Sequence, residues 1–354
     1  MTRRLLALLF VLALPGVADA SVPTGFFGVT YDREITGAPA PVQAQQWARM
    51  RANGIQSVRM VFDWSVAQPR EGGPIGFRRT DLAVERAARR GLILLPCVLY
   101  APAWARTDPA SGAAPPKDPG QYAAYLTALV GRYGTNGSFW AEHPSVPKHP
   151  IHDWQLWNEP SLRFQWDAPN WPKGYAALVR ASDDALNAAD PRSRTVLAGL
   201  PNRSWQELAK LYKEGGIKGH YDVAAFHPYT DRPEFVVRIA RYIRNVLASH
   251  GDARKPAWIT EFSLPASYKR TDSLNTLQTN DVGMARFLLN TYVALAKYGP
   301  RRDVGVSRAY WYSWATTYHG PSIFDYSGLN RYSSSKLNRR LALGYYRIAV
   351  RRLR

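Results

Sequence analysis

From residue 25 onward, short apolar β-prone runs alternate with longer stretches in which apolar positions recur every three or four residues. The first pattern predicts buried strands and the second predicts amphipathic helices. The predicted strands are 25–31, 56–62, 92–100, 151–157, 195–200, 221–226, 257–261 and 309–314. The predicted helices that follow them in turn are 41–52, 80–90, 119–133, 172–189, 204–214, 232–250, 281–298 and 336–352.

Eight strand–helix pairs in succession, with no block of strands or helices alone, predict parallel strand pairing. The α/β fold that fits this order is a (β/α)₈ TIM barrel. An open doubly wound sheet is the alternative, but no glycine-rich phosphate turn follows the first predicted strand. Segments 101–118 and 133–150 are rich in proline or glycine and are interpreted as loops. The sequence therefore predicts a single domain over residues 21–354.

The first twenty residues have a pattern of their own. Arg3 and Arg4 precede an apolar run over residues 5–14, and Ala18-Asp19-Ala20 has the small-x-small form of a cleavage site. This predicts a signal peptide over residues 1–20 and a protein that is secreted or held in the cell envelope. An uncleaved N-terminal anchor is the alternative. We expect no stable membrane insertion of the mature chain, because no later segment is long and apolar enough.

Net charge and cysteine content indicate which partners and which covalent links the chain can have. The formal net charge is +19, with basic residues spread along the predicted helices, which is typical of a solvated outer face. Such a charge also favours an anionic polysaccharide or an acidic envelope surface as a partner. Nucleic acid is not expected, because the chain carries no recognisable nucleic-acid-binding motif. Cys97 is the only cysteine, so no intramolecular disulfide can form, and its apolar strand predicts a buried, inert thiol.

Two predicted strands end on a carboxylic acid. Trp157-Asn158-Glu159-Pro160 closes the fourth strand, and proline cannot donate to a strand ladder, so this strand should end near Glu159. The seventh predicted strand ends on Glu261. Cleavage of a glycosidic bond needs such a pair of acids, here with Glu159 as proton donor and Glu261 as nucleophile. Asn158 would then bind the sugar 2-hydroxyl. A surface ion pair is the alternative for either glutamate alone.

Other strand ends fit the same chemistry. Arg59 lies within an apolar strand and needs an anionic partner, for which Glu261 is available. An ion pair with a purely structural acid is the alternative. His227 and Tyr229 have the same strand parity, so both can point inward, with Tyr229 placed to hold Glu261 ionised. We expect no metal and no cofactor, because no second histidine or acid lies at ligand spacing from His227.

Several tryptophans follow predicted strands. Trp311 and Trp314 have opposite parity on the last strand, and Trp314, nearer the strand end, is predicted to form the floor under the reacting sugar. Trp64, Trp104 and Trp166 lie in loops at the same end of the barrel, where indole faces can stack on sugar rings. Packing in the core is the alternative for each of them.

These strand-end motifs resemble those of the large clan of retaining (β/α)₈ glycoside hydrolases. That clan carries its acid/base glutamate after strand four and its nucleophile after strand seven. The resemblance spans nearly all of the mature chain, as scattered motifs rather than continuous similarity. The residues that carry it are Arg59, Trp157-Asn158-Glu159-Pro160, His227-Pro228-Tyr229, Thr260-Glu261 and Trp314.

Within the clan, residues 157–191 look like glycoside hydrolase family 39 and its bacterial relatives. Family 5, the cellulase-like enzymes, is the second choice, because those usually carry a histidine at the end of strand three and residues 96–100 contain none. Phe262-Ser263 after the nucleophile departs from the glycine or tryptophan often found there, which puts the wall beside Glu261 in doubt.

The resemblance implies a cofactor-free, retaining glycoside hydrolase that cleaves a β-linked polysaccharide or oligosaccharide by double displacement. Its two carboxyl groups should lie about 5–5.5 Å apart. A non-catalytic carbohydrate-binding barrel and a transglycosylase that handles envelope polysaccharide are the alternatives. A phosphate-handling lyase is a further rival, but no glycine-rich turn marks a phosphate site after strands seven and eight.

Overall fold

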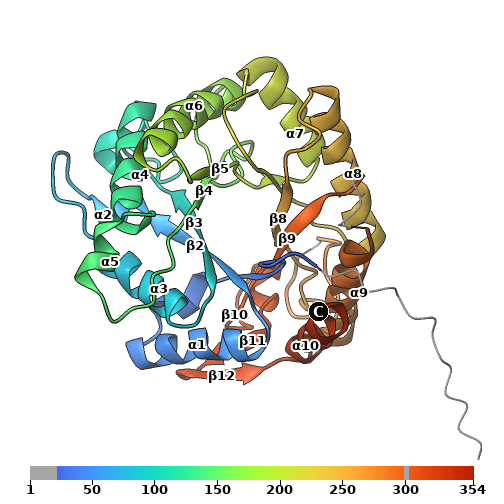
Figure 1. Ribbon diagram of the computed structural model, residues 1–354. Helices are drawn as coiled ribbons and strands as arrows, with labels where there is room; N and C mark the ends of the chain where they lie inside the picture. Colours follow the sequence, from blue (N-terminus) through green and yellow to red (C-terminus); the bar gives the residue numbers. More distant parts are fainter. Residues whose placement is uncertain (1–21, 274, 299–302) are drawn as a thin grey trace, which may run out of the picture.

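The computed structural model of the protein describes residues 22–273, 275–298 and 303–354. In this part of the chain, parallel strands form a sheet that is rolled into a barrel and surrounded by helices (Figure 1). The predicted (β/α)₈ barrel is therefore confirmed. No helix among these residues has the length and apolarity needed to cross a membrane. The predicted signal segment, residues 1–20, lies outside the described residues.

Around the barrel the strands are arranged in sequence order. The first strand pairs with the last, which closes the ring. They are β1 (Phe27–Thr30), β2 (Ser57–Asp63), β3 (Ile93–Leu99), β4 (Asp153–Leu156), β5 (Arg194–Val196), β6 (Leu200–Pro201), β7 (Ala224–His227), β8 (Ala257–Phe262) and β9 (Val306–Trp311).

The fifth predicted strand, 195–200, is split into two short pieces. β5 pairs with β4, and β6 pairs with β7, all in parallel. A single parallel bridge between Val196 and Val223 joins the two sides of this break and completes the ring. The break lies beside the residues that follow β4.

The helices pack outside the strands (Figure 1). They are α1 (Ala40–Ala52), α2 (Trp64–Ala67), α3 (Arg78–Ala88), α4 (Pro119–Tyr133), α5 (Ser138–Glu142), α6 (Trp171–Ala189), α7 (Ser204–Lys210), α8 (Pro233–Ser249), α9 (Asp281–Tyr298) and α10 (Leu341–Leu353). Short turns of 3₁₀-helix are η1 (Arg33–Gly37), η2 (Ala103–Ala105) and η4 (Ile323–Tyr326), and η3 (Leu211–Gly215) is a π-helical turn.

Helix α4 shows why the predicted helix limits are accurate where local chemistry is strong. Asp118 accepts a hydrogen bond from the backbone of Gly120, and Pro119 occupies the first helical position, where its missing N–H is no loss. Tyr122, Leu126 and their neighbours on the same face are buried against the sheet. The observed limits of α4 and α9 are the predicted ones.

The last predicted helix, 336–352, begins too early. Its first residues instead form a strand of a small second sheet of β10 (Ala315–Thr316), β11 (Asn330–Ser333) and β12 (Lys336–Arg339). β11 and β12 pair antiparallel through a tight turn at Ser334 and Ser335, which both have positive φ. This two-residue turn matches the twist of a hairpin and ends any helix before Leu341.

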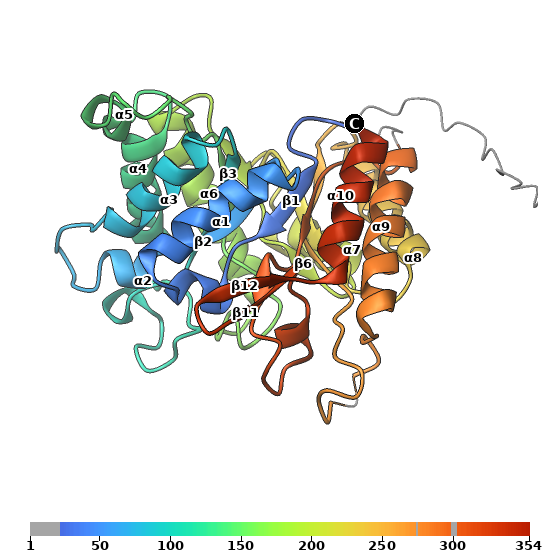
Figure 2. The same ribbon diagram turned by 90° about the horizontal axis from the view of Figure 1, so that it is seen from below.

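Because the barrel strands are parallel, the residues that follow them meet at one end of the barrel. Long segments after β8 and β9 project from this end, at the lower edge of Figure 2. The opposite end is formed by the first residues of the strands. These two ends carry different arrangements of charge, described below.

Candidate active site

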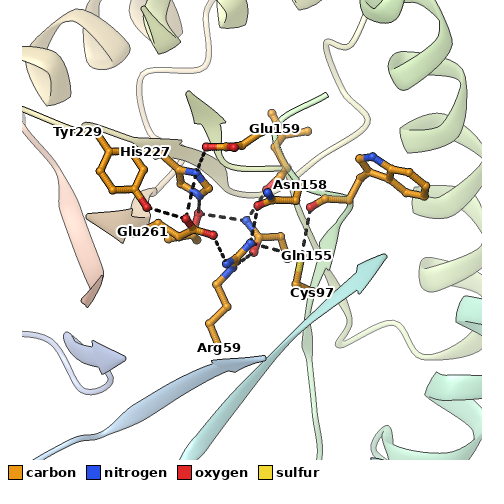
Figure 3. Close-up of polar contacts among 11 residues, drawn as sticks. Arg59, Cys97, Gln155, Asn158, Glu159, His227, Tyr229 and Glu261 are labelled. Atoms are coloured by element: carbon orange, nitrogen blue, oxygen red, sulfur yellow. Dashed lines mark hydrogen bonds and ion pairs between the residues drawn. The ribbon is translucent and has the colours of Figure 1, made fainter. Parts of the chain in front are cut away.

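Glu261, on β8, is held by one donor from β2 and one from the segment that follows β7. Arg59 Nη1, from β2, donates to Glu261 Oε1 at 2.5 Å, and the Tyr229 hydroxyl donates to Oε2 at 2.7 Å (Figure 3). Arg59 is only 3% exposed. The predicted ion pair of Arg59 with Glu261 and the predicted contact from Tyr229 are therefore both confirmed.

Both donors favour the ionised form of Glu261. Burial alone would raise the pKa of this carboxyl, but the neighbouring His227, Arg59 and Tyr229 outweigh burial and lower it. Burial, together with the charge of Glu261, raises the pKa of Tyr229 well above its ordinary value. Tyr229 therefore keeps its proton and remains a hydrogen-bond donor, while Glu261 remains a carboxylate.

Glu159 lies immediately after β4 in an unusual backbone conformation. β4 ends at Leu156, and Trp157 and Glu159 both have positive φ, 67° and 41°, which non-glycine residues rarely adopt. The backbone N–H of Glu159 donates to the Gly199 carbonyl at 3.2 Å, in the break between β5 and β6. Strained backbone of this kind is concentrated at functional sites, where the surrounding structure holds it.

His227 links the two glutamates. It is the last residue of β7, and Pro228 follows it, so the strand stops there. His227 Nδ1 lies 2.7 Å from Glu159 Oε1 and 3.8 Å from Glu261 Oε2. His227 and Tyr229 thus both point into the site, as predicted. A Cβ atom on Gly199 would lie 1.8 Å from His227 Nε2, so only glycine leaves room for this ring.

Two residues that the sequence analysis did not select, Gln155 and Thr260, orient His227. Gln155 Oε1 accepts from Arg59 Nε at 2.5 Å, so its amide nitrogen is the atom that donates to Thr260 Oγ1 at 3.1 Å. The proton of the Thr260 hydroxyl then has His227 Nε2 as its acceptor, at 3.0 Å. By this hydrogen-bond logic His227 carries its proton on Nδ1 and donates it to Glu159.

The polarity of Gln155 and Thr260 within apolar strands could have indicated them. Gln155 lies on β4 two residues before Trp157, and Thr260 directly precedes Glu261. Both are polar residues within otherwise apolar strands and both are completely buried. A buried polar residue requires hydrogen-bond partners, so a polar residue within an apolar strand predicts a contact with other polar groups of the site.

The two carboxylates lie close together across the site. One oxygen of Glu159, one of Glu261 and a ring nitrogen of His227 are all within 4.8 Å of one another. Acids therefore do lie within reach of His227, contrary to the sequence-based reasoning about metal ligands. Glu159 already forms a hydrogen bond with His227, and Glu261 forms hydrogen bonds with Arg59 and Tyr229.

Asn158 lies between the two acids and Arg59. Its Oδ1 accepts from Arg59 Nη2 at 2.8 Å, so its amide nitrogen is the atom left to donate to a sugar hydroxyl. Arg59 Nη2 also lies 3.3 Å from the sulfur of Cys97, which is completely buried. Burial raises the pKa of the Cys97 thiol, in agreement with an unreactive structural role.

The prediction of sugar-stacking faces is wrong for three tryptophans. Trp314 is completely buried and its indole N–H donates to Gln46 on α1, because β9 ends at Trp311 and strand parity does not extend to residue 314. Trp64 is completely buried and stacks on Tyr125. Trp166 is 3% exposed and packs edge-on against Trp157 and Tyr175.

Trp104 remains partly exposed, with its indole N–H donating to the Gln68 carbonyl at 2.9 Å. The ring of Tyr229, which contacts Glu261, is partly exposed, and so are the nearby rings of Tyr312 and Phe324. The Phe324 ring packs against both Tyr229 and Tyr312, with centroids 5.0 Å and 5.8 Å apart. Tyr312 directly follows β9, so its place at a strand end was the signal that could have identified it.

Comparison with solved structures shows the same fold at low sequence identity. A family 39 glycoside hydrolase from the gut symbiont Bacteroides cellulosilyticus WH2 matches with a TM-score of 0.68 and 16% identity, over 95% of this chain and 65% of that one. The present chain thus spans a little less than two thirds of that protein. A subfamily 18 member of glycoside hydrolase family 5 from Streptomyces cattleya, solved with GlcNAc, matches with a TM-score of 0.68 and 18% identity, over 94% and 81%.

A monomeric β-xylosidase from Caulobacter crescentus CB15 matches with a TM-score of 0.62 and 17% identity, over 94% of this chain and 69% of that one. No protein-family model matches the sequence. No curated protein matches it either. At such identities the likeness establishes the architecture: the chain has the (β/α)₈ barrel fold of glycoside hydrolases of families 39 and 5, as the resemblance of its motifs predicted.

Proposed function

We propose that the protein is a retaining glycoside hydrolase with Glu159 as acid/base and Glu261 as nucleophile. The observation that carries this proposal is the close approach of the two carboxylates, one oxygen of each lying within 4.8 Å of one oxygen of the other. Retaining enzymes hold these groups about 5–5.5 Å apart, whereas inverting enzymes leave about 6.5–9.5 Å for a water molecule. The spacing here supports direct attack on the sugar.

The surroundings of the acids suit their different tasks. Glu261, kept ionised by Arg59 and Tyr229, attacks the anomeric carbon, while Glu159 gives its proton to the departing glycosidic oxygen. The product of this step is a covalent glycosyl-enzyme. Glu159, now a carboxylate held by His227, takes a proton from water, which attacks the anomeric carbon and releases Glu261.

For the substrate we propose a β-linked polysaccharide or oligosaccharide that carries acidic sugars. The β-linkage rests on the likeness to the Caulobacter β-xylosidase. The acidic character rests on a small cavity of about 170 Å³ formed by Arg270, Arg331, Arg340 and Tyr318, which belong to segments following β8 and β9. Asp281 pairs with two of these arginines, so a net positive charge remains for a carboxylate.

This basic cavity is connected to the site by packing. Tyr326 donates its hydroxyl to the Arg270 carbonyl at 3.1 Å, and Phe324 of the same turn, η4, packs on Tyr229. A bound chain that passes over Phe324 would therefore reach the arginines. We also propose that the protein acts outside the cytoplasm, on the basis of the signal pattern in residues 1–20.

The test is hydrolysis by the purified protein of neutral and uronic-acid-containing β-glycans and aryl β-glycosides, with Glu261→Ala in parallel. We expect release of sugar by the wild type, with faster turnover of acidic than of neutral glycans, and none by the variant. Azide should restore turnover of an aryl glycoside to the variant by occupying the space of the missing carboxylate.

The stereochemistry separates the mechanisms. NMR of the first product should show the same anomeric configuration as the substrate, and the opposite configuration would overturn double displacement. Longer oligosaccharides among the products would show that another sugar takes the intermediate in place of water. Binding of glycans without turnover would instead support the carbohydrate-binding barrel.

A further inference from the structure

A second cavity, of about 460 Å³, opens at the end of the barrel opposite Glu159 and Glu261. It lies at the first residues of three neighbouring strands, β3, β4 and β5, and is closed on one side by the loop that leads into β4. Its lining comprises Ile93, Leu94, residues 148–153, Arg192, Arg194 and Arg308. The proposed glycosidase chemistry uses none of these residues.

The lining is strongly unbalanced in charge. Lys148, Arg192, Arg194 and Arg308 contribute four cations, and Asp153 is the lone acid among the lining residues. Both oxygens of Asp153 are already taken, by Arg194 at 2.5 Å and by Arg308 at 2.7 Å. In the described ranges, Lys148 and Arg192 have no ion-pair partner. The cavity therefore holds three positive charges beyond those that its own acid can neutralise.

Two of the guanidinium groups are fixed in place before any ligand arrives. Arg308 is 11% exposed and lies over the Trp258 ring, 4.1 Å from its centroid. Arg194 lies over the same ring at 5.5 Å. Stacking of this kind holds the planar donor groups rigid, so little side-chain entropy is lost when they bind an anion.

Two histidines, His149 and His152, also line the cavity. The pKa of His152 is lowered by burial and by Arg192, with a smaller contribution from Arg194, while Asp190 and Asp153 act in the opposite direction. Burial and the proximity of His152 lower the pKa of His149. His152 Nε2 also lies 3.1 Å from the hydroxyl of Thr135. An anion placed among these groups would favour proton uptake by both imidazoles.

We propose that this cavity is a binding site for a multivalent oxyanion of the phosphate or sulfate type, either free or carried by an acidic polymer. Guanidinium groups bind such anions through paired, charge-assisted hydrogen bonds. One water molecule occupies about 30 Å³ in the liquid, so a cavity of about 460 Å³ can hold an oxyanion together with part of the molecule that carries it. A polymer bound here would anchor the protein and leave the other end of the barrel open.

The probes are inorganic pyrophosphate for a free anion and dextran sulfate for a polymer-borne anion, with uncharged dextran as the control ligand. Binding is measured by titration calorimetry and by the rise in Tm at low salt. The test variant is Lys148→Gln/Arg192→Gln, whose two side chains are exposed, so the fold should survive. The matched control, Arg79→Gln/Arg238→Gln, removes two exposed cations from helices α3 and α8.

We expect at least one of the two anions to bind, and its affinity to fall about ten-fold or more in the test variant. In the control the change should stay within about two-fold. Binding should strengthen as the pH falls from 7.5 toward about 6, because His149 and His152 take up protons with the anion. Which of the two probes binds then assigns the source of the anion.

The proposal is overturned if neither anion binds at low salt, or if the test variant and the control variant lose affinity equally. The outcome is independent of the proposed glycosidase activity. Glu261→Ala should bind the anion as tightly as the wild type does, and Lys148→Gln/Arg192→Gln should hydrolyse small aryl glycosides at the wild-type rate.

Discussion

Two buried arginine–carboxylate pairs lie inside the barrel, one at each end. Arg59 pairs with Glu261 where the strands finish, and Arg308 pairs with Asp153 where they begin. In each pair the guanidinium is almost inaccessible and the carboxylate comes from a strand that is not adjacent in the ring. Each is the kind of pair that a protein interior requires once a charge is buried.

The pairs differ in what surrounds the carboxylate. Asp153 is held by two arginines, one on each of its oxygens, and is the one acid among the residues that line its cavity, so its charge is used in holding the strands together. Glu261 is held by one arginine and by Tyr229, and one oxygen of Glu159 lies within 4.8 Å of one of its oxygens. A buried ion pair thus becomes a candidate reaction centre when a second acid, oriented separately by His227, faces the same space.

The largest expected difference between the two ends is in activity. Glu261→Gln removes the proposed nucleophile and should reduce hydrolysis to the background rate, whereas Asp153→Asn should leave kcat per folded molecule unchanged. Glu159→Gln removes general acid–base assistance and should lower kcat by about 10²–10⁴-fold on substrates with poor leaving groups. The measurement is kcat on a common substrate, corrected for the folded fraction by circular dichroism. Loss of kcat in Asp153→Asn would contradict the division between the two ends.

The second comparison concerns stability. Asp153→Asn leaves Arg194 and Arg308 facing each other without a counter-charge and should lower the free energy of unfolding by about 3–5 kcal/mol. Glu261→Gln should have a smaller effect, because Arg59 keeps Gln155 and Asn158 as acceptors. Urea denaturation of the two variants tests this order. Equal losses would mean that the two acids contribute alike to folding.

The pH dependence of activity tests the environment of Glu261. The pKa of Glu261 is lowered in the folded protein, so this group stays ionised, and stabilises the fold, down to a pH below the ordinary glutamate value of about 4.3. This stabilisation is lost as the pH falls through the folded-state pKa. The acid limb of kcat/KM should therefore lie below about 4.3. Tyr229→Phe, which removes one donor, should move that limb upward.

The smallest expected effect is that of the hydrogen bonds behind His227. Thr260→Val removes the hydroxyl that lies between Gln155 and His227, and should lower kcat by about ten-fold or less, the effect of one buried hydrogen bond. It should also move the basic limb of the pH profile, because His227 orients Glu159. Thr260→Ser retains the hydroxyl and should restore both properties. If the serine variant were as impaired as the valine variant, loss of packing rather than of the hydroxyl would be responsible.

Strand-end logic predicted the polar part of the site well. Asn158, Glu159, His227 and Glu261 were selected because a charge or a polar group at the end of an apolar strand has few other places to be satisfied, and Arg59 because its charge lies within such a strand. The same reasoning did not reach Gln155 and Thr260, which lie within β4 and β8 and are completely buried. It also failed for Trp314, because alternation of faces holds only while the chain remains a strand, and β9 stops at Trp311.

Loop tryptophans were beyond sequence reasoning for a different reason. An indole ring buries more apolar surface than most side chains, and Trp64 and Trp166 turn inward to the core, where aromatic neighbours enclose them. Which side of a loop faces the solvent depends on contacts with segments far away in the chain. The partly exposed rings of Tyr312 and Phe324 near Tyr229 result from such contacts.

The sequence by itself determined the order of strands and helices, the barrel that this order requires, and the end of the barrel at which the acids gather. It did so because hydrophobic periodicity is a local property of the sequence, and eight strand–helix pairs in succession fit a closed parallel barrel. Tertiary structure alone decided the distance between Glu159 and Glu261, the orientation of His227, and the collection of Lys148, Arg192, Arg194 and Arg308 around one cavity. Those features depend on side chains from strands and loops far apart in the chain, and only packing around the closed ring brings them within a few ångströms of each other.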